Sequence, residues 1–441
     1  MRRVVITGMG WVTPLGTDLD SVWSRLLAGE CAAGPVTRFD ASTFATNFAA
    51  EVKGFDLDTL LPGATARHPH AGLNSQFALG AAAQAWRMAG LGRAGAMDPR
   101  RTGLYMGAGE GPMDFDSFAY ANIAGWNAET RTVNDAAWEA AALSRFKAAL
   151  EVEQEPNMVL AHLAQEFGCR GPAYNCMTAC AASTQAVGEA FEIIRRGDAD
   201  TMLAGGTHSM IHPLGMTGFI RLTAMSKRRD DPRTASRPFD ASRDGFVMGE
   251  GAGMVVLEEL ERARSRGATI HAEVAGFGSS ADAFRITDIQ PHGKGAQAAM
   301  VQACRQAGIN PREPGEDGRP QVHYISAHGT GTEENDKIET AAVKGVFGAL
   351  APRVPFSSVK SVLGHLIQAA GAVELMTCVM AMKTGVLPPT MNLHSPDPDC
   401  DLDYVPNKAR DVSAQGGVHV CLSNSFGFGG QNNTLCVRRF P

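Results

Sequence analysis

The sequence lacks any long hydrophobic run. None of its 441 residues fall in a stretch of about 18 uninterrupted apolar residues, the length that a membrane helix needs. The best candidate, residues 365–382, contains Gln368 and Glu374. The N-terminus enters a strand-like run at once and lacks the apolar segment and cleavage site of a signal peptide. We therefore expect no membrane span and a cytoplasmic location.

The sequence also lacks a strong charge of one sign. It has 40 basic and 46 acidic side chains, a net charge of -6, so bulk nucleic-acid binding is not expected. Its 9 cysteines are odd in number, scattered and without a CxxC pair, which indicates reduced thiols rather than a disulfide framework. No HExxH, paired CxxC or GxxxxGK[ST] motif occurs, so neither a metal site nor a phosphate-binding loop is predicted.

The sequence is rich in glycine, with 49 residues. Its hydrophobic content of 44% is enough to form a full buried core. Alanine-rich segments of helical character occupy residues 77–89 and 184–196. Short β-rich runs, several ending in glycines such as Gly8 and Gly10, lie at 3–7, 102–106, 201–204 and 254–257. This alternation predicts an α/β fold with an at least partly parallel sheet.

A weak internal repeat is visible. Residues 271–278 resemble residues 3–10, and 322–326 would correspond to 102–106. The helix expected after His365 would likewise match the helix after Cys180. The junction would lie in the charged stretch 258–267. From the pattern alone, a chance similarity of this size explains the observation equally well.

Cys180 is a candidate nucleophile. It lies in Asn-Cys-Met-Thr-Ala-Cys-Ala-Ala-Ser-Thr, residues 175–184, where an amphipathic helix begins. A thiol at a helix N-terminus lies near the positive end of the dipole and near free N–H groups, which favour the reactive thiolate. The backbone amide there could also bind an oxyanion. The alternative is a buried structural cysteine, which a lone cysteine usually is.

Two histidines stand in glycine-rich contexts. His328 opens His-Gly-Thr-Gly-Thr, where glycines let the backbone approach a ligand and the hydroxyls of Thr330 and Thr332 can bind it. His365 would open an alanine-rich helix, whose dipole disfavours the charged imidazole and leaves a neutral Nε2–H donor. The alternative for His328 is a loop histidine with all of its hydrogen bonds satisfied, and this basis does not distinguish the two.

Two further segments could support the same chemistry. Glu374 lies on a largely apolar helix, so it is either a buried acid that needs a partner, such as a lysine, or an ordinary exposed one. Residues 424–432 read Asn-Ser-Phe-Gly-Phe-Gly-Gly-Gln-Asn. Such a glycine-rich run with two aromatic anchors suits a lid over a site. The alternative is a tight reversal between strands.

Together these motifs resemble those of the elongating, type II β-ketoacyl-acyl-carrier-protein synthases, which have the thiolase fold. The motifs that carry the resemblance are Thr178-Ala-Cys180, residues 328–332, Lys360 with Gly364-His365, residues 424–430, Ser236-Arg-Pro-Phe-Asp240 and residues 244–253. The resemblance implies two duplicated βαβαβαββ halves, residues 1–262 and 263–441, in a five-layer αβαβα arrangement. The first half would carry the nucleophile and the second both histidines.

The resemblance also implies a role for each residue. Cys180 would hold the acyl chain as a thioester, while His328 and His365 assist decarboxylation and stabilise the enolate. Lys360 would orient this network together with Glu374. The remaining implied residues are the oxyanion-hole amides of Cys180 and Phe428, the supporting acids Asp336 and Glu339, and the substrate-binding positions Thr330, Thr332, Glu110, Phe426, Gly427 and Gly429.

The implied reaction is a decarboxylative Claisen condensation of malonyl-acyl-carrier-protein with the acyl chain on Cys180, in fatty-acid biosynthesis. The implied partners are an acyl carrier protein and a second copy of the chain, in a homodimer. No cofactor of its own is implied, because the substrate protein carries the 4'-phosphopantetheine. The basic run 227–237, with Arg221, could meet an acidic carrier or could simply be a solvated loop. Alternatives are a ketosynthase of a polyketide-like or unusual-lipid pathway, a non-catalytic partner subunit and a CoA-dependent thiolase.

Three features depart from the family pattern. Glu110 stands where relatives commonly have a small or branched apolar residue that gates the acyl pocket. A misalignment by one residue, or a side chain turned to solvent, would explain it equally well. The segment 112–151 is longer and more polar than usual and could reshape the dimer interface or the substrate pocket. Gln368 and Gln431 replace smaller residues. These departures leave chain length, starter and pathway open.

Overall fold

One sheet of ten strands runs through the part of the chain that the computed structural model describes, residues 1–93, 95–109, 111 and 113–441. Its strands are β1 (Val4–Val12), β4 (Thr102–Ala108), β7 (Ala173–Cys176), β8 (Thr201–His208), β9 (Gly251–Glu259), β10 (Ala272–Ala281), β11 (Tyr324–Ser326), β12 (Phe356–Ser357), β15 (Val420–Gly427) and β16 (Gln431–Arg438). The two-stranded ribbons are β2 (Gly34–Pro35) with β3 (Phe48–Ala49), β5 (Trp126–Asn127) with β6 (Thr132–Val133), and β13 (Val386–Leu387) with β14 (Arg410–Asp411).

The order of the strands shows the duplication. The first half runs β7-β4-β8-β9-β1 and the second runs β12-β11-β15-β16-β10, so each half has the same order of its own five strands. In both halves the first two pairings are parallel and the next two antiparallel. The halves meet where β1 pairs antiparallel with β10. The internal repeat inferred from sequence is therefore a structural duplication.

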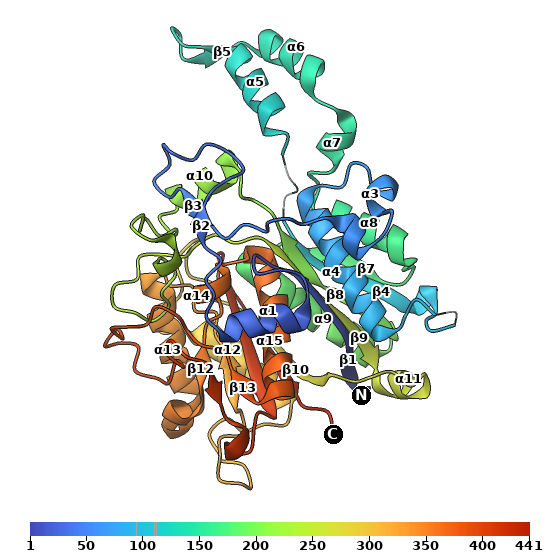
Figure 1. Ribbon diagram of the computed structural model, residues 1–441, viewed down its shortest axis with the longest axis vertical. Coiled ribbons are helices and arrows are strands. Elements are labelled where there is room, and N and C mark those ends of the chain that lie inside the picture. The colour runs from blue at the N-terminus through green and yellow to red at the C-terminus, as the bar shows by residue number, and fades with distance from the viewer. Residues whose placement is uncertain (94, 110, 112) are drawn as a thin grey trace.

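Helices cover the sheet in layers. The longer helices are α1 (Leu19–Leu27), α4 (Leu73–Ala89), α8 (Met158–Phe167), α9 (Ala182–Arg196), α10 (Pro213–Arg221), α12 (Lys294–Gln306), α13 (Glu333–Phe347) and α15 (Ala370–Thr384). The shorter ones are α2 (Leu57–Leu60), α3 (Ala64–Arg67), α11 (Leu260–Ser265) and α14 (Lys360–Leu363). Helices α9 and α15 contact strands of both halves, α4 and α8 cover the first half, and α12 with α13 covers the second (Figure 1). Because α9 and α15 contact both halves of the sheet, the halves form two β layers with these helices between them. With the outer helices this is the predicted five-layer αβαβα arrangement of the thiolase fold.

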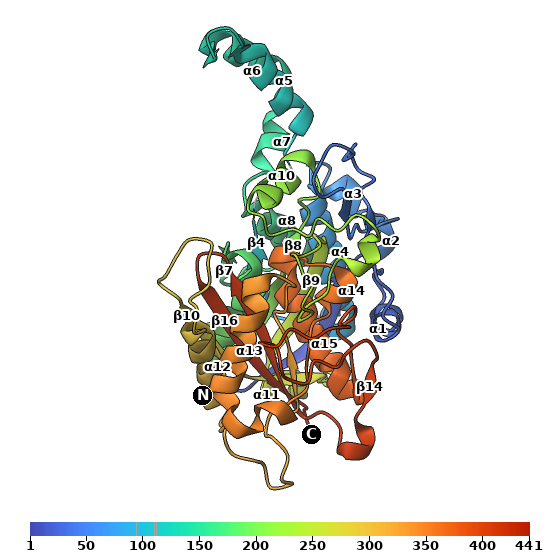
Figure 2. The same ribbon diagram turned by 90° about the vertical axis from the view of Figure 1, so that its left-hand side faces the viewer.

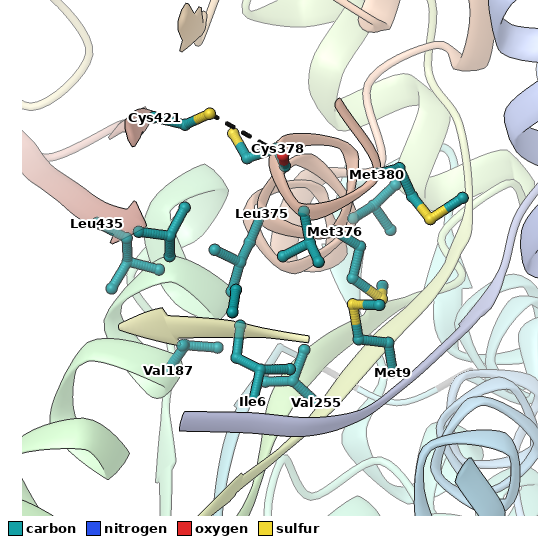
Figure 3. Packing of buried hydrophobic residues seen from close by; sticks show 14 of the residues in the cluster. Ile6, Met9, Val187, Val255, Leu375, Met376, Cys378, Met380, Cys421 and Leu435 are labelled. Carbon is teal, nitrogen blue, oxygen red and sulfur yellow. Dashed lines mark hydrogen bonds between the residues drawn. The ribbon is translucent and has the colours of Figure 1, made fainter. Parts of the chain in front are cut away.

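Helix α15 forms the centre of the main core because nearly all of its side chains are buried. Figure 3 shows Leu375 and Met376 of this helix packed towards Ile6 and Val255, and Val187 of α9 lies close by. A helix that is apolar all round belongs in the interior of a layered protein. The two halves therefore share one core, and a site placed between them rests on a rigid base.

The predicted strands are present, but several run further than their apolar segments. Strand β1 continues through Gly8 and Gly10, which the sequence suggested would end it. A Cβ atom on Gly8 would lie 2.0 Å from the carbonyl oxygen of Ala85, and one on Gly10 would lie 2.1 Å from that of Ala81. Glycine is required there because α4 packs directly on the strand. These glycines permit close packing instead of forming a turn.

An arm projects from the body of the first half (Figures 1 and 2). It consists of α5 (Phe115–Gly125), the β5–β6 ribbon, α6 (Asp135–Arg145) and α7 (Ala148–Val152). This arm is the segment that the sequence marked as unusually long. Among the described residues, no helix combines the length and the hydrophobicity that crossing a membrane requires.

Candidate active site

A pocket of about 340 Å³ lies where the two halves meet, and residues from both line it. Cys180 and Phe246 come from the first half. The second half supplies the larger share, namely His328, Thr330, Thr332, His365, Phe426, Gly427 and Phe428. The structure thus brings together residues that lie nearly 250 positions apart in the sequence.

Cys180 sits at a sharp turn ahead of α9. The short 3-10 helix η2 (Ala179–Ala181) leads into α9, as the sequence predicted. The preceding residue, Ala179, has a φ of 48°, a left-handed conformation that costs free energy for any residue with a Cβ. Strain of this kind persists only where the surrounding structure holds it, and it is concentrated at functional sites. Here it turns the thiol towards the pocket.

The expectation that the helix terminus would favour a thiolate at Cys180 is wrong for the resting protein. Burial raises the pKa of the thiol to about 12, and the nearby charge of Lys360 only partly opposes this. The side chain is 5% exposed, so the loss of hydration outweighs the dipole. The thiol is therefore protonated at neutral pH and must lose its proton as it reacts.

The two histidines face Cys180. His328 follows β11, and His365 lies between α14 and the 3-10 helix η5 (Ile367–Ala369). Ring nitrogens of both and the Cys180 sulfur lie within 4.8 Å of one another. The two rings are 5.6 Å apart, centroid to centroid, and nearly perpendicular at 82°. One small molecule could therefore contact all three groups at once.

His365 is held in a defined orientation and tautomer. Its Nδ1 accepts a hydrogen bond from the backbone N–H of Ile367 at 3.2 Å, so the neutral ring carries its proton on Nε2. That Nε2 has no partner among the described residues. Burial, with the charge of Lys360, lowers the pKa of His365 well below 6.5. The predicted neutral Nε2–H donor is present. Its cause is burial and not the dipole of the following helix, because α15 begins only five residues after His365.

His328 is neutral for the same reasons. It is 3% exposed, and burial together with the charge of Lys360 lowers its pKa well below 6.5. Its ring packs against Phe426 at a centroid distance of 5.7 Å. The pocket therefore holds two uncharged imidazoles and no fixed positive charge on either ring.

Lys360 and Glu374 form a buried pair below the histidines. The Lys360 ammonium donates to the main-chain oxygen of His328 at 2.5 Å and to the Glu374 carboxylate. Each residue is 1% exposed. Burial raises the pKa of Glu374 to about 7, although the lysine opposes this. Of the two readings of Glu374, the buried acid with a lysine partner is confirmed.

Two acids on α13 hold the backbone of the His328 loop. The Glu339 carboxylate accepts the N–H groups of His328 and Gly329 at 2.9 and 2.8 Å. Asp336 accepts the N–H of Gly331 at 3.2 Å. Neither carboxylate lines the pocket. Both acids therefore support the loop that carries His328.

Residues 427–430 form the turn between β15 and β16, so the reading of this segment as a tight reversal is the one that the structure shows. Gly427 lies against the nucleophile: a Cβ there would be 3.3 Å from the backbone nitrogen of Cys180. Phe428 follows it and lines the pocket. Gly429 is at the exposed tip, where its N–H donates to the Ile286 oxygen at 2.7 Å.

The other predicted substrate positions lie at the pocket or outside the described residues. The hydroxyls of Thr330 and Thr332 lie 2.9 Å apart in its wall. Glu110, the predicted gate, lies outside the described residues.

Comparison with known proteins agrees with this geometry. Residues 1–263 match the β-ketoacyl synthase N-terminal domain, and residues 271–394 match the C-terminal domain. A 3-oxoacyl-[acyl-carrier-protein] synthase 2 of Coxiella burnetii is 41% identical over 438 residues, 99% of each chain. The chain belongs to the β-ketoacyl synthase family. It is therefore an acyl-transferring condensing enzyme.

Solved structures show the same fold. A β-ketoacyl synthase from Burkholderia phymatum superimposes with a TM-score of 0.87 at 33% identity, covering all of both chains. A ketosynthase solved in complex with a type II PKS acyl-carrier protein superimposes with a TM-score of 0.84 at 30% identity, again over all of both chains. The whole synthase fold is thus shared, including both halves of the pocket.

Sequence reasoning missed one support of this synthase site. Arg243 is buried and donates to the main-chain oxygen of Thr332 at 3.1 Å and to Asp397 at 2.8 Å, which ties down the end of the His328 loop. Its position next to the conspicuous segment 244–253 was the only signal.

Proposed function

We propose that this synthase catalyses the decarboxylative condensation of malonyl-acyl-carrier-protein with an acyl chain held on Cys180, the elongation step of fatty-acid synthesis. The observation that carries the proposal is the convergence of one thiol and two neutral imidazoles within 4.8 Å in a buried pocket. Both the family and the Coxiella burnetii relative support the reaction class.

The first step is acyl transfer. The Cys180 thiol gives up its proton as its sulfur attacks the carrier thioester, a new thioester forms, and the proton leaves with the carrier thiol. A buried thiol with a pKa of about 12 does not react as a free thiolate, so the neutral imidazole of His328 takes the proton in transit. The lone pair of His365 already accepts the N–H of Ile367, which leaves that ring as a donor. The backbone N–H of Cys180, with that of Phe428, binds the oxyanion that develops.

The second step makes the carbon–carbon bond. Loss of carbon dioxide from the malonyl group leaves an enolate, whose oxygen accepts hydrogen bonds from the imidazole N–H groups of His365 and His328. The enolate carbon then attacks the acyl carbon on Cys180 and releases the thiol. Neutral donors suit this step because they interact most strongly when the negative charge appears.

Lys360 positions the donors without touching the substrate. Its ammonium holds the main-chain oxygen of His328, and its charge disfavours a second positive charge on either ring. Glu374 satisfies the lysine, so no buried charge is left alone. Thr330 and Thr332, in the wall towards the exposed rim, are suited to hold the polar pantetheine arm.

We also propose that an acidic carrier protein docks beside the pocket entrance. Exposed Arg221 directly precedes Leu222 of the pocket lining, and Lys227 and Arg229 are exposed nearby in the sequence. Such a local positive surface steers an acidic partner even though the net charge of the chain is negative. Reversing Arg221 and Lys227 to glutamate should raise KM for the carrier-bound substrate but not for a pantetheine thioester.

A homodimer is the assembly that the exposed surface favours. Strand β7 is the edge strand of the first half, and Tyr174 on it is 53% exposed. The arm exposes further large apolar side chains, including Ile123 at 78% and Leu143 at 79%. An open strand edge and exposed large apolar side chains are each typical of protein interfaces. Light scattering should give a dimer for the native chain and a monomer for Tyr174→Glu.

We place the enzyme in a reducing compartment, the cytoplasm, and assign it no cofactor or metal of its own. The nine cysteines are all free thiols, which suits reducing conditions. The proposed chemistry needs only side chains, backbone amides and the carbon dioxide leaving group. Metal analysis of the purified, active enzyme tests the assignment, because a stoichiometric metal that activity requires would contradict it.

The central test uses Cys180 variants. Cys180→Ala should give no acyl-enzyme in intact-mass spectra, whereas Cys180→Gln should still release carbon dioxide from malonyl-carrier without condensation. The matched control is Cys31→Ala, a half-buried cysteine outside the pocket lining, which should acylate normally. A covalent acyl adduct on Cys180→Ala would contradict the proposal. Activity of the purified chain alone excludes a non-catalytic partner subunit.

A further inference from the structure

A short segment, residues 246–250, holds His365 in two ways. The main-chain N–H of His365 donates to the Val247 oxygen at 2.7 Å, and the N–H of Gly249 donates to the His365 oxygen at 2.9 Å. The Phe246 ring meets the His365 imidazole edge to face, with centroids 5.2 Å apart. The segment therefore fixes both the backbone and the ring of the histidine that is the proposed donor in decarboxylation.

On its other side the segment is held by residues 50–52. The N–H of Ala50 donates to the Met248 oxygen at 2.8 Å. The N–H of Val52 donates to the Glu250 carboxylate, also at 2.8 Å. The segment thus lies between two other pieces of chain and is hydrogen-bonded to both. Its own position depends on the contacts with 50–52.

Glu250 anchors the end of the segment. Its carboxylate accepts a second hydrogen bond from the guanidinium of Arg38, which lies in the loop between β2 and β3. Both donors share the oxygen Oε1, and Oε2 has no partner among the described residues. The Glu250 side chain is fully buried, whereas that of Arg38 is 29% exposed. The anchor is therefore a buried acid whose recorded counter-charge comes from the surface.

A carboxylate in this place costs stability. Burial raises the pKa of Glu250 to about 7, and the charge of Arg38 and the N–H of Val52 only partly oppose this. An acid whose pKa is higher in the folded than in the unfolded protein destabilises the fold at neutral pH. Such acids are concentrated at functional sites, where an effect on the reaction offsets the cost. Neither Glu250 nor Arg38 lines the pocket, so an effect on the reaction acts through another residue.

We propose that Glu250 and Arg38 are positioning residues for His365. The inference rests on the proposed condensation. Arg38 and the Val52 N–H hold Glu250, Glu250 holds the segment 246–250, and the segment aims the Nε2–H of His365 at the enolate oxygen. A displacement of about 1 Å at a reacting group can cost about 100-fold in rate, so an anchor outside the pocket can control this step.

The test separates the two steps of the reaction. Release of carbon dioxide from malonyl-carrier is measured in the Cys180→Gln background, and acyl loading is measured by intact mass on proteins that keep Cys180. Glu250→Leu removes the acceptor of both hydrogen bonds. We expect it to slow decarboxylation by about 10-fold or more and acyl loading by less than about threefold, because His328 and not His365 takes the thiol proton. Equal loss of both steps would overturn the proposal.

Glu250→Gln tests rescue by a conservative change. Its amide oxygen still accepts from Val52 and Arg38, so decarboxylation should stay within about threefold of the parent rate, and thermal stability at neutral pH should not fall. A Gln variant as slow as the Leu variant would show that the carboxylate does not act by holding the segment. The matched control is Glu273→Leu, at another buried acid that binds arginine but lies outside the pocket lining. It should lose stability and keep the native ratio of the two rates.

A second variant and a spectroscopic signal keep the test decisive if Glu250→Leu folds poorly. Arg38→Met, at a partly exposed position, should also slow decarboxylation more than loading. In ¹³C-histidine NMR, the signal that disappears in His365→Ala should shift in Arg38→Met and not in Glu273→Leu. If the Cys180→Gln parent releases no carbon dioxide, the proposed function itself fails. If it does, and Arg38→Met changes neither the rate nor the signal, only the present proposal fails.

Discussion

Lys360 shows how one residue can organise a reaction that it never touches. Its ammonium is shared between the main-chain oxygen of His328 and the Glu374 carboxylate, and it is almost fully buried. A buried charge is tolerated only with a partner, so the pair is structural as well as functional. The structural and the functional role of Lys360 can be separated by experiment, because its partner Glu374 can be replaced in the same variant.

Lys360→Met should destabilise the protein by about 3–5 kcal/mol, because it leaves Glu374 buried without its partner. Adding Glu374→Leu should recover most of that loss, since an apolar pair of similar volume needs no hydration. Decarboxylation should stay slow in both variants, because neither holds the His328 oxygen. Thermal unfolding and carbon dioxide release measure the two effects. Recovery of activity in the double variant would show that Lys360 only stabilises the fold.

The two active-site histidines should remain neutral in mildly acidic solution. The pKa values of His328 and His365 are lowered well below 6.5, so the neutral, donating form persists as pH falls through that value. In ¹³C-histidine NMR, the two signals that disappear in His328→Ala and His365→Ala should not shift between about pH 8 and about pH 5.5, where free imidazole titrates. A midpoint near 6.5 for either signal would contradict the neutral-donor assignment.

At the scale of elements, the site depends on a strand end pressed against a helix start. The β15–β16 turn brings Gly427 to the amide of Cys180, where α9 begins. The Thr184 hydroxyl of α9 and the Ser425 hydroxyl of β15 are hydrogen-bonded at 2.7 Å, which joins the two elements just behind the site. The proposed oxyanion hole is therefore made by the fit of two elements from different halves.

Gly427→Ala tests this fit. Its new Cβ would lie 2.7 Å from the Thr178 oxygen, closer than real Cβ contacts, so the turn must move away from Cys180. We expect acylation of Cys180 to slow by about 100-fold or more, the typical effect of losing one oxyanion donor. Stability should change little by comparison. As a control, Gly54→Ala meets nothing within 4 Å, although its φ of 64° adds some backbone strain, and should acylate normally. Near-normal acylation of Gly427→Ala would argue against an oxyanion hole here.

At the scale of the whole molecule, one acid ties the two ends of the chain together. Glu273 on β10 accepts hydrogen bonds from Arg3, just before β1, at 2.9 Å, and from Arg438 at the end of β16, also at 2.9 Å. Burial of Glu273 would raise its pKa, but the two arginines overcome this and lower the pKa to about 2. The two termini consequently lie close together (Figure 1).

Glu273→Gln should lower the free energy of unfolding at neutral pH by about 1–2 kcal/mol, because both arginines are partly exposed and solvent screens them. The native carboxylate has the lowered pKa, so its contribution is complete above about pH 4.5 and disappears as pH falls towards 2. The stability difference between native protein and variant, from urea unfolding at several pH values, should therefore vanish over that window. A difference that stays constant with pH would contradict the assignment.

Much of this architecture was predictable from the sequence because local patterns fix local structure. The apolar run at residues 3–7 and the helix at 184–196 were placed correctly, and the motifs around Cys180 and His328 identified the family. Strand ends were less predictable. Gly8 and Gly10 suggest a turn in sequence, and only the approach of α4 shows why they lie inside a strand.

The reaction class and its principal groups follow from the sequence alone, because a nucleophile and its histidines stand in motifs that are specific in residue type and order. The protonation states of these groups depend on the tertiary structure. Burial, which depends on every neighbouring element, raises the pKa of Cys180 to about 12 and keeps His365 neutral, against the expectation of a reactive thiolate from the helix terminus.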